Sequence, residues 1–450
     1  MAERFDAIIL GMGPGGEDVA GRLLSAGKKV ALVEKELLGG ECAYWACIPS
    51  KTLLRPPEVK GEASRAVGTG TPELDLKDIF DYRDYIIRNL DDSGEVKSYE
   101  EKGATVIRGE GRLNGPGRVE VDGETLAADH VVVATGSASN TLPIEGLEEV
   151  TVWTNREATT TREVPERTVI VGGGPNGIET SQWLSRMGSK VTLVQSPDRL
   201  INREDPQVSG IIQPILEEEM DVRVGRRIEK ARKENGAAVV TLDDGEEIPT
   251  DVLVTVAGRT PRVEGIGLES VGIEPDTAGL SVDDRCRVEG GPDGLWAVGD
   301  VIGILLFTHV AQYQGRIVAA NILGGDRRAD YAGIPRVVFS DPEIAATGLT
   351  EEEAREQGMD VASIDLELPK ALARPVTYEK DPRGNLGLVV DRNERVLVGA
   401  WAVAPLAGEW IHLACLAVKT RLPVDVLLDS VFQFPTFSQA YFEALEKMDL

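Results

Sequence analysis

Residues 5–16 read FDAIILGMGPGG, an apolar run that ends directly in a glycine-rich turn. A helical pattern and a second apolar segment follow, and that segment ends in Glu34, 23 residues past Gly11. Gly11 permits the tight turn, Gly13 lets the backbone approach a pyrophosphate, and Gly16 lets the helix pack on the strand. The stretch therefore predicts a parallel α/β sheet with a dinucleotide at the helix N-terminus and Glu34 on a ribose.

The same pattern recurs in the middle of the chain, where residues 168–177 read TVIVGGGPNG. Gly172, Gly174 and Gly177 occupy the places of the three glycines of the first turn, and a helix and an apolar strand are again expected to follow. Two dinucleotide sites in one chain predict a relay, in which one cofactor delivers a hydride and the other receives it.

The two turns differ at the position of the acid. Gln195 stands 23 residues past the first glycine of the second turn, where the first turn has Glu34. A carboxylate there would repel a 2′-phosphate, whereas a neutral amide tolerates one, and Arg199 and Arg203 follow closely enough to bind it. This favours NADPH over NADH; the alternative is that both arginines are solvated loop charges.

Residues 39–51 read GGECAYWACIPSK, and this segment resembles the redox-active segment of the pyridine nucleotide-disulfide oxidoreductases, such as lipoamide dehydrogenase, glutathione reductase and mercuric reductase. Four further motifs resemble that family in its own order: ATGS at 134–137, GRTP at 258–261, AVGD at 297–300 and FSDPEIA at 339–345. The resemblance implies an oxidoreductase with FAD at the first glycine turn and NADPH or NADH at the second.

The resemblance also implies roles for single residues. Cys47 matches the cysteine beside the flavin that forms the charge-transfer thiolate, and Cys42 matches the interchange thiol that meets substrate. Lys51 matches the lysine near the reactive nitrogen of the flavin, and Glu179 matches its acidic partner; the alternative is a surface pair of little energy. Further cofactor contacts are implied at Thr135, Gly136, Gly299 and Asp300 for FAD, and at Gly258 for the nicotinamide.

The spacing of the two cysteines constrains the backbone. Residues five apart in a straight helix have Cα atoms roughly 8–9 Å apart, whereas a disulfide needs about 4.4–6.8 Å. A Cys42–Cys47 disulfide therefore requires a break in the helix, which Pro49 fits. The alternatives are buried thiols and a metal site, and with three histidines and no second cysteine pair a zinc site lacks ligands. Cys286 and Cys415 lie outside any motif and are expected in the core.

The C-terminal run FPTFSQ, residues 434–439, departs from the family. Thiol-exchanging members carry a His where this chain has Phe434 and a Glu where it has Gln439, and that dyad serves as acid and base in the partner subunit. Neither Phe434 nor Gln439 can shuttle a proton, and a positioned acid or base contributes typically about 10²- to 10⁴-fold. Efficient exchange with dihydrolipoamide or glutathione is therefore not expected. Mercury reduction is not supported either, because the chain ends without a cysteine pair.

Aromatic residues gather in the same motifs. Tyr44 and Trp45 stand between the cysteines, and together with Phe434, Phe437 and Tyr441 they are expected to line an entrance suited to a planar or apolar acceptor. Tyr44 or Tyr441 would then be the candidate to replace the histidine as proton donor. The alternative for Trp45 and Phe437 is a place in an interface core.

The expected fold class is α/β, with two Rossmann-like domains and a C-terminal α+β dimerisation domain. The FAD domain is expected at 1–149 and 275–330, the NAD(P) domain at 150–274 and the interface domain at 331–450, where apolar runs on either side of residues 391–395 predict a hairpin. The resemblance implies a homodimer.

The charge composition argues against some classes of binding partner. The net charge is −27 at pH 7, a field that repels nucleic acid and anionic membrane surfaces, and it reflects either life at high salt or a well-solvated surface. Neither an apolar run long enough to span a bilayer nor a signal peptide is recognised, so a cytoplasmic protein is expected.

Three functions remain open. The first is an NAD(P)H-dependent reductase that passes electrons through FAD and the Cys42–Cys47 disulfide to a disulfide or other small acceptor. The second reduces a quinone, metal ion or dye directly from the flavin. The third is a redox-sensing or binding flavoprotein subunit without a substrate of its own.

Overall fold

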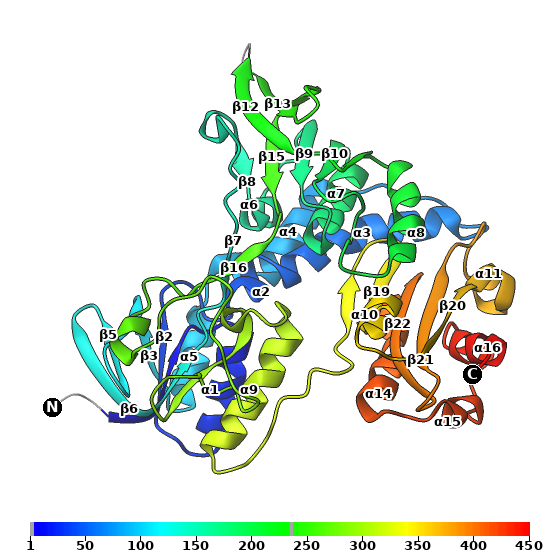
Figure 1. Ribbon diagram of the computed structural model, residues 1–450. Coiled ribbons are helices and arrows are strands. Elements are labelled where there is room, and N and C mark those ends of the chain that lie inside the picture. The colour runs from blue at the N-terminus through cyan, green and yellow to red at the C-terminus, as the bar shows by residue number, and fades with distance from the viewer. Residues whose placement is uncertain (1–3, 235–236) are drawn as a thin grey trace. The chain divides into compact units, whose positions relative to one another are not determined.

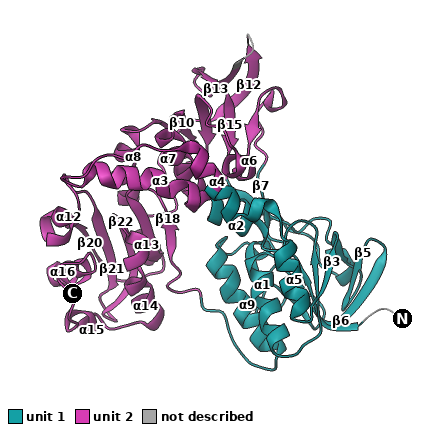
Figure 2. Ribbon diagram, turned by 180° about the vertical axis from the view of Figure 1, so that it is seen from behind, with its two compact units in different colours: residues 1–49, 82–140, 258–330 teal, residues 50–81, 141–257, 331–450 magenta. Residues whose placement is uncertain are grey.

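The computed structural model describes residues 4–234 and 237–450. The chain divides into two compact units, each assembled from three separate stretches of sequence (Figure 2). Unit 1 comprises residues 1–49, 82–140 and 258–330, and unit 2 comprises residues 50–81, 141–257 and 331–450. The divisions at 49/50 and 81/82 fall within α3 (Cys47–Arg65) and α4 (Leu76–Ile86).

Unit 1 is built on a seven-stranded sheet in the order β3-β2-β1-β6-β5-β4, with β17 paired to β6 (Figure 1). Strands β1, β2, β3, β6 and β17 run parallel. Of these, β2 and β17 are apolar runs buried on both faces over most of their length, as is typical of parallel sheets. The strands are β1 (Arg4–Leu10), β2 (Val30–Glu34), β3 (Thr105–Arg108), β4 (Gly111–Leu113), β5 (Arg118–Val121), β6 (Glu124–Val133) and β17 (Leu295–Ala297). A separate ribbon pairs β7 (Ser137–Ser139) with β16 (Arg259–Pro261).

Helices cover this sheet. Helix α1 (Pro14–Ser25) leaves the first glycine turn and packs beside α9 (Thr308–Ile322), as Figure 1 shows. The remaining elements of unit 1 are α2 (Gly40–Tyr44), α5 (Ser93–Glu101) and the 3₁₀ turns η1 (Arg88–Leu90), η3 (Leu268–Val271) and η4 (Gly299–Ile302).

Unit 2 contains the second glycine turn on a five-stranded sheet in the order β11-β10-β9-β15-β8. Its elements are β8 (Val152–Trp153), β9 (Arg167–Val171), β10 (Lys190–Gln195), β11 (Asp221–Val224), β15 (Val252–Thr255), η2 (Leu147–Glu149), α6 (Asn155–Thr160), α7 (Pro175–Arg186) and α8 (Pro206–Glu217). An antiparallel sheet of β12 (Ile228–Glu234), β13 (Ala237–Leu242) and β14 (Glu247–Thr250) adjoins it in sequence.

The C-terminal part of unit 2 is an antiparallel sheet in the order β18-β19-β22-β21-β20. Its strands are β18 (Arg336–Val338), β19 (Glu343–Gly348), β20 (Val361–Glu367), β21 (Asn385–Asp391) and β22 (Val396–Ala404). Its helices are α10 (Glu351–Glu356), α11 (Leu368–Ala371), α12 (Ala373–Tyr378), α13 (Ala407–Trp410), α14 (His412–Thr420), α15 (Val424–Leu428) and α16 (Gln439–Lys447). The pairing of β21 with β22 confirms the predicted hairpin.

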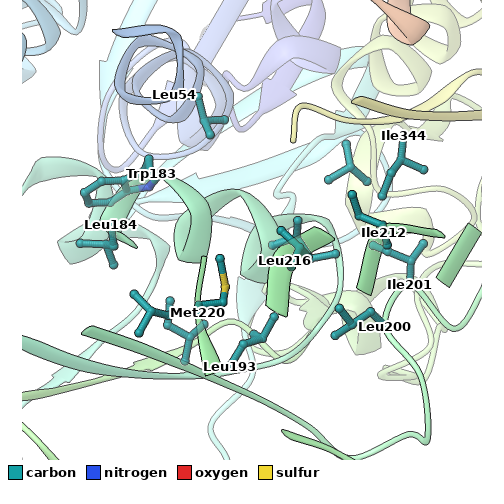
Figure 3. Packing of buried hydrophobic residues seen from close by; sticks show 14 of the residues in the cluster. Leu54, Trp183, Leu184, Leu193, Leu200, Ile201, Ile212, Leu216, Met220 and Ile344 are labelled. Atoms are coloured by element: carbon teal, nitrogen blue, oxygen red, sulfur yellow. The ribbon is translucent and has the colours of Figure 1, made fainter. Parts of the chain in front are cut away.

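The largest core cluster of unit 2 joins stretches that are far apart in sequence. Leu54 from α3, Trp183 from α7 and Ile344 from β19 all belong to it and are buried (Figure 3). Burial of such side chains contributes about 1.5–3 kcal/mol each. The part of α3 from residue 50 onward therefore packs into the core of unit 2. This packing holds the backbone of Lys51 in place.

The α/β class, the two sheets that carry the glycine turns and the C-terminal α+β part are confirmed. The three-domain boundaries stay a prediction. Among the helices of the described residues, none has the length and apolar character needed to cross a bilayer.

Candidate functional site

The first glycine turn has the shape that a diphosphate requires. Gly11 has φ +97°, and a Cβ atom on it would lie 2.4 Å from the Ala134 carbonyl oxygen. A Cβ on Gly16 would lie 2.2 Å from the Gly11 carbonyl oxygen, so neither position accepts a side chain. Gly13 differs, because apart from its two chain neighbours no heavy atom of the described chain lies within 4 Å of the place of a Cβ. The open space stands at the N-terminus of α1, where backbone N–H groups favour an anion.

Glu34 holds this turn together. Its Oε2 accepts a hydrogen bond from the Met12 N–H at 2.8 Å, and its Oε1 accepts one from the Glu36 N–H at 2.8 Å. Each carboxylate oxygen retains a lone pair, so Glu34 can bind a ribose hydroxyl while it caps the turn.

The second turn repeats the first in three dimensions. A Cβ on Gly177 would lie 1.6 Å from the Gly172 carbonyl oxygen, while Gly174 has open space around it in the described structure. Gln195 Oε1 accepts a hydrogen bond from the Gly173 N–H at 2.7 Å, the counterpart of the bond from Met12 to Glu34. The Gln195 side chain therefore keeps the hydrogen bond that caps the turn but carries no negative charge.

Arg199 is engaged in its own loop. Its guanidinium donates to the carbonyl oxygens of Glu204 at 2.9 Å and Asn202 at 2.8 Å. This revises the expectation that Arg199 reaches a 2′-phosphate, because binding one would require these donors to leave the carbonyls. Arg203 is exposed on the same loop.

The two cysteines lie on different helices. Cys42 is in α2, which ends at Tyr44, and Cys47 is the first residue of α3. The intervening Trp45 has φ −133°, outside helical geometry, so the predicted break in the helix is confirmed. Cys47 Sγ lies 3.3 Å from Oγ1 of Thr308, the first residue of α9. The sequence offered no signal for Thr308.

Lys51 and Glu179 form an ion pair within unit 2. The Lys51 Nζ donates to both carboxylate oxygens of Glu179, at 2.7 and 3.0 Å. The same carboxylate accepts from Ser50 Oγ at 2.9 Å and from the Phe339 N–H at 3.1 Å, and its side chain is only 3% exposed. The interpretation as a surface pair is therefore wrong. Ser50 and Phe339 are partners that the sequence did not reveal.

The three motifs at residues 134–137, 258–261 and 297–300, all in unit 1, are joined by hydrogen bonds. Ser137 Oγ donates to Asp300 Oδ2 at 2.6 Å, and Arg259 Nε donates to Ser137 Oγ at 2.7 Å. Thr135 Oγ1 donates to the Arg262 carbonyl oxygen at 2.8 Å. Gly136, Gly258 and Gly299 all have positive φ and mark the turns of these motifs.

The C-terminal aromatic residues do not share one environment. Phe434 is 65% exposed, whereas Phe437 is buried in the core of the C-terminal sheet. Gln439 is the first residue of α16 and accepts from the Thr436 N–H at 3.4 Å. Tyr441 is fully buried, its hydroxyl donates to the Trp410 carbonyl oxygen, and burial raises its pKa. Tyr441 is therefore corrected from an entrance residue to a core residue and cannot serve as the proton donor near neutral pH.

Tyr44 needs the same correction. Its side chain is buried in unit 1, its hydroxyl accepts from Arg88 at 3.3 Å, and burial raises its pKa. The half-buried Trp45 packs against it with ring centroids 5.8 Å apart. Burial removes Tyr44 from the expected aromatic entrance. Cys286 and Cys415 are buried, as predicted.

Comparison with known proteins agrees with this geometry. A family model described as pyridine nucleotide-disulphide oxidoreductase matches residues 5–315, and the model of that family's dimerisation domain matches residues 334–445. A dihydrolipoyl dehydrogenase from Thermus scotoductus is 34% identical over 455 residues, which cover 99% of this chain and 97% of that protein. A mercuric reductase from Staphylococcus aureus is 32% identical over 444 residues, which cover 97% of this chain and 81% of that protein.

Two solved structures are similar to this chain over nearly its whole length. The Cu(II) complex of the HOCl-induced flavoprotein disulfide reductase RclA from Escherichia coli has a TM-score of 0.87 and 26% identity, covering 98% of this chain and 99% of that one. LpdA from Mycobacterium tuberculosis has a TM-score of 0.87 and 27% identity, covering 99% of both chains.

The chain belongs to the pyridine nucleotide-disulphide oxidoreductase family. It is a flavoprotein oxidoreductase that uses FAD and NAD(P)H, and it carries a dimerisation domain. The two open glycine turns fit these dinucleotides, because each offers a helix N-terminus and an uncovered backbone where a diphosphate binds.

Proposed function

We propose that this chain is an NAD(P)H-dependent reductase in which Cys42 and Cys47 form the redox couple that reduces a small acceptor. The main support for the proposal is the break between α2 and α3. In one straight helix the two cysteines would be too far apart for a disulfide, and the break removes that constraint. Bound FAD supplies the chemistry that accepts a hydride and returns two electrons. The pair then takes up two electrons and two protons as its S–S bond opens to two thiols.

The residues around the cysteines support different roles for the two thiols. Cys47 stands at the N-terminus of α3, where the helix dipole favours a thiolate over a thiol. The Thr308 hydroxyl, 3.3 Å from Cys47 Sγ, can donate a hydrogen bond to that thiolate. We assign Cys47 to the flavin side and Cys42, in the short helix α2, to attack on the acceptor.

The buried ion pair supports a role for Lys51 beside the flavin. Glu179 receives four hydrogen bonds and fixes the ammonium group of Lys51 in one place. A fixed ammonium stabilises negative charge on a reduced flavin better than a mobile one, because no reorganisation is needed when the charge appears. We therefore assign Lys51 to flavin reduction and Glu179 to positioning it.

The dinucleotides are assigned by the two turns. We place FAD on Gly11, Gly13 and Gly16 with Glu34 on its ribose, and the nicotinamide dinucleotide on the second turn. Gln195 removes the charge that would repel a 2′-phosphate, so NADPH is the preferred donor in this proposal. Its 2′-phosphate does not depend on Arg199, whose donors bind carbonyl oxygens of its own loop.

A second function is favoured by the C-terminal segment. Phe434 and Gln439 offer no acid or base, so an acceptor that needs no proton from that position is chemically easier than a disulfide. Metal ions are reduced without a proton, a quinone or dye can take its protons from water, and the relatives include mercuric reductases. We propose such an acceptor as the second candidate, with electrons leaving from the flavin. In both cases the dimerisation domain supports a homodimer.

Single cysteine variants distinguish the two candidates. Under the first proposal, Cys42→Ser abolishes turnover with a disulfide acceptor but leaves flavin reduction by NADPH intact. The same variant should show a long-wavelength band from the Cys47 thiolate beside oxidised flavin, which Cys47→Ser should lack. The measurements are anaerobic stopped-flow reduction and steady-state turnover with a disulfide and with a quinone. Full quinone turnover in both variants, together with no disulfide turnover in the unaltered protein, would favour the second candidate.

A further inference from the structure

Helix α2 begins against the first glycine turn. The Gly39 N–H donates to the Met12 carbonyl oxygen at 2.7 Å, and a Cβ on Gly40 would lie 2.8 Å from Gly13 Cα. The residue that follows, Glu41, is thus attached beside the open backbone of Gly13. An acidic residue next to this turn in the fold is unexpected, because the turn and the α1 N-terminus are built to receive an anion.

Two arginines from one distant segment face that carboxylate. Arg262 Nη2 lies 3.6 Å from Glu41 Oε1, and Arg259 Nη2 lies 3.9 Å from Glu41 Oε2. The Glu41 and Arg262 side chains are 20% and 28% exposed, so solvent screens the pair only in part.

Arg262 is held at the same turn. Its backbone N–H donates to the Gly136 carbonyl oxygen at 2.9 Å, and its carbonyl oxygen accepts from Thr135 Oγ1 at 2.8 Å. Thr135 Cα lies 3.2 Å from the place of a Cβ on Gly11. All of these residues belong to unit 1, so the carboxylate, the guanidinium and the turn are placed by one compact body.

The two arginines are not equivalent. Arg259 donates to Ser137 Oγ at 2.7 Å and to the Ser137 carbonyl oxygen at 2.9 Å, so much of its guanidinium serves the β7–β16 ribbon. The shorter contact to Glu41 comes from Arg262.

We propose that Arg262 is a positioning residue for FAD that neutralises Glu41 beside the diphosphate, so that cofactor affinity depends on the pair. The inference rests on the proposed placement of FAD at the first glycine turn. A diphosphate brings two negative charges next to Glu41, and an opposite charge within a few ångströms offsets their repulsion. The same ion pair fastens α2, which carries Cys42, to the segment that begins at Gly258.

A double-mutant cycle on Glu41 and Arg262 tests the proposal. Arg262→Gln removes the nearer of the two guanidinium groups that face the carboxylate and should raise the FAD dissociation constant about tenfold, the equivalent of about 1.4 kcal/mol. Glu41→Gln removes the repulsion and should bind FAD at least as tightly as the unaltered protein. The double variant should return to within about threefold of it, because the loss and the gain share one cause. The measurement is equilibrium binding of FAD to apoprotein, followed by flavin fluorescence.

Two controls separate the possible failures. Gly13→Ala places a methyl group in the open space of the turn, where a Cβ has no heavy atom within 4 Å apart from its chain neighbours, so it should fold and lose FAD affinity. If this variant keeps full FAD affinity, the placement of FAD is wrong. If it loses FAD while Arg262→Gln binds normally, the placement stands and the role of Arg262 is wrong. Independent, additive losses from Glu41→Gln and Arg262→Gln would also overturn the proposal, as would losses that match a fall in apoprotein stability measured by thermal unfolding.

Discussion

At the scale of the residue, the carboxylate of Glu179 carries the largest energetic consequence. Replacing Lys51 by Met leaves this 3% exposed charge with Ser50 and the Phe339 N–H as its donors among the described residues. Breaking one partner from a buried pair costs about 3–5 kcal/mol, and the lower end applies because Lys51 is partly exposed. We expect the thermal unfolding midpoint of Lys51→Met to fall by roughly 3 °C, because the lost stability is divided by the unfolding entropy of a 450-residue chain; scanning calorimetry would measure it.

The chain provides a matched control for that experiment. Lys190 pairs with Glu166 at 3.4 Å, but these side chains are 77% and 75% exposed. Lys190→Met should therefore change stability by less than about 0.5 kcal/mol. Adding Glu179→Gln to Lys51→Met should recover much of the lost stability, because the uncompensated charge is then gone. Equal shifts for Lys51→Met and Lys190→Met would contradict the assignment of a buried pair.

Single residues are also where prediction from sequence reached its limit. Cys42, Cys47, Lys51 and Glu179 were candidates because the motifs around them resemble those of a known family, and the structure pairs Lys51 with Glu179. Tyr44 and Tyr441 could not be placed, because a tyrosine is equally suited to a core with a hydrogen-bond partner and to a wet entrance. The pairing of Glu41 with Arg262 had no local signal at all, since the two belong to segments that only the folded chain brings together.

At the scale of the element, the break between α2 and α3 is the feature on which the proposed redox pair depends. Pro49 is the third residue of α3, where a helix needs no N–H donor, but in one continuous helix its ring would clash with the Trp45 carbonyl. Pro49→Ala removes this steric obstacle to a continuous helix. In a straighter backbone the two cysteines lie farther apart. We expect the Cys42–Cys47 disulfide to become easier to reduce, with a potential less negative by about 30 mV, the equivalent of about 1.4 kcal/mol.

The measurement is equilibration in dithiothreitol redox buffers followed by alkylation of the thiols. Pro56→Ala is the control, because Pro56 lies inside the same helix but beyond the redox segment. It should leave the potential unchanged. A potential that does not move in Pro49→Ala, or that moves equally in both variants, would show that the packing of α3 maintains the break without Pro49.

Elements as such were largely predictable. Both glycine turns with their flanking strands and helices, and the hairpin of β21 and β22, follow from apolar runs bounded by turn residues. The turn at Arg88–Leu90 was not foreseen, because three successive non-glycine residues have positive φ there. L-residues avoid that region, so nothing in the residue types signals it.

At the scale of the whole molecule, the net charge of −27 opposes any association of two copies. Apolar surface must then supply the attraction, and the C-terminal part of unit 2 offers it: Val431 is 99% exposed, Phe434 65% and Val426 47%. Such side chains are costly to leave in water, and we expect a homodimer to cover them. Salt screens the repulsion without weakening apolar contacts, so the homodimer should tighten as ionic strength rises.

Replacing Val431 by Asp tests this directly. The variant adds a charge to the surface that dimerisation would bury, so the dimer dissociation constant should rise by at least about 100-fold, in line with a cost of roughly 3 kcal/mol for an unpaired charge at an interface. Analytical ultracentrifugation at low and high salt measures it. Leu323→Asp, at a 43% exposed position in unit 1, is the matched control and should leave the dimer intact. Dimers of equal strength in both variants would place the interface elsewhere, and a monomer in the unaltered protein at every salt concentration would contradict the homodimer itself.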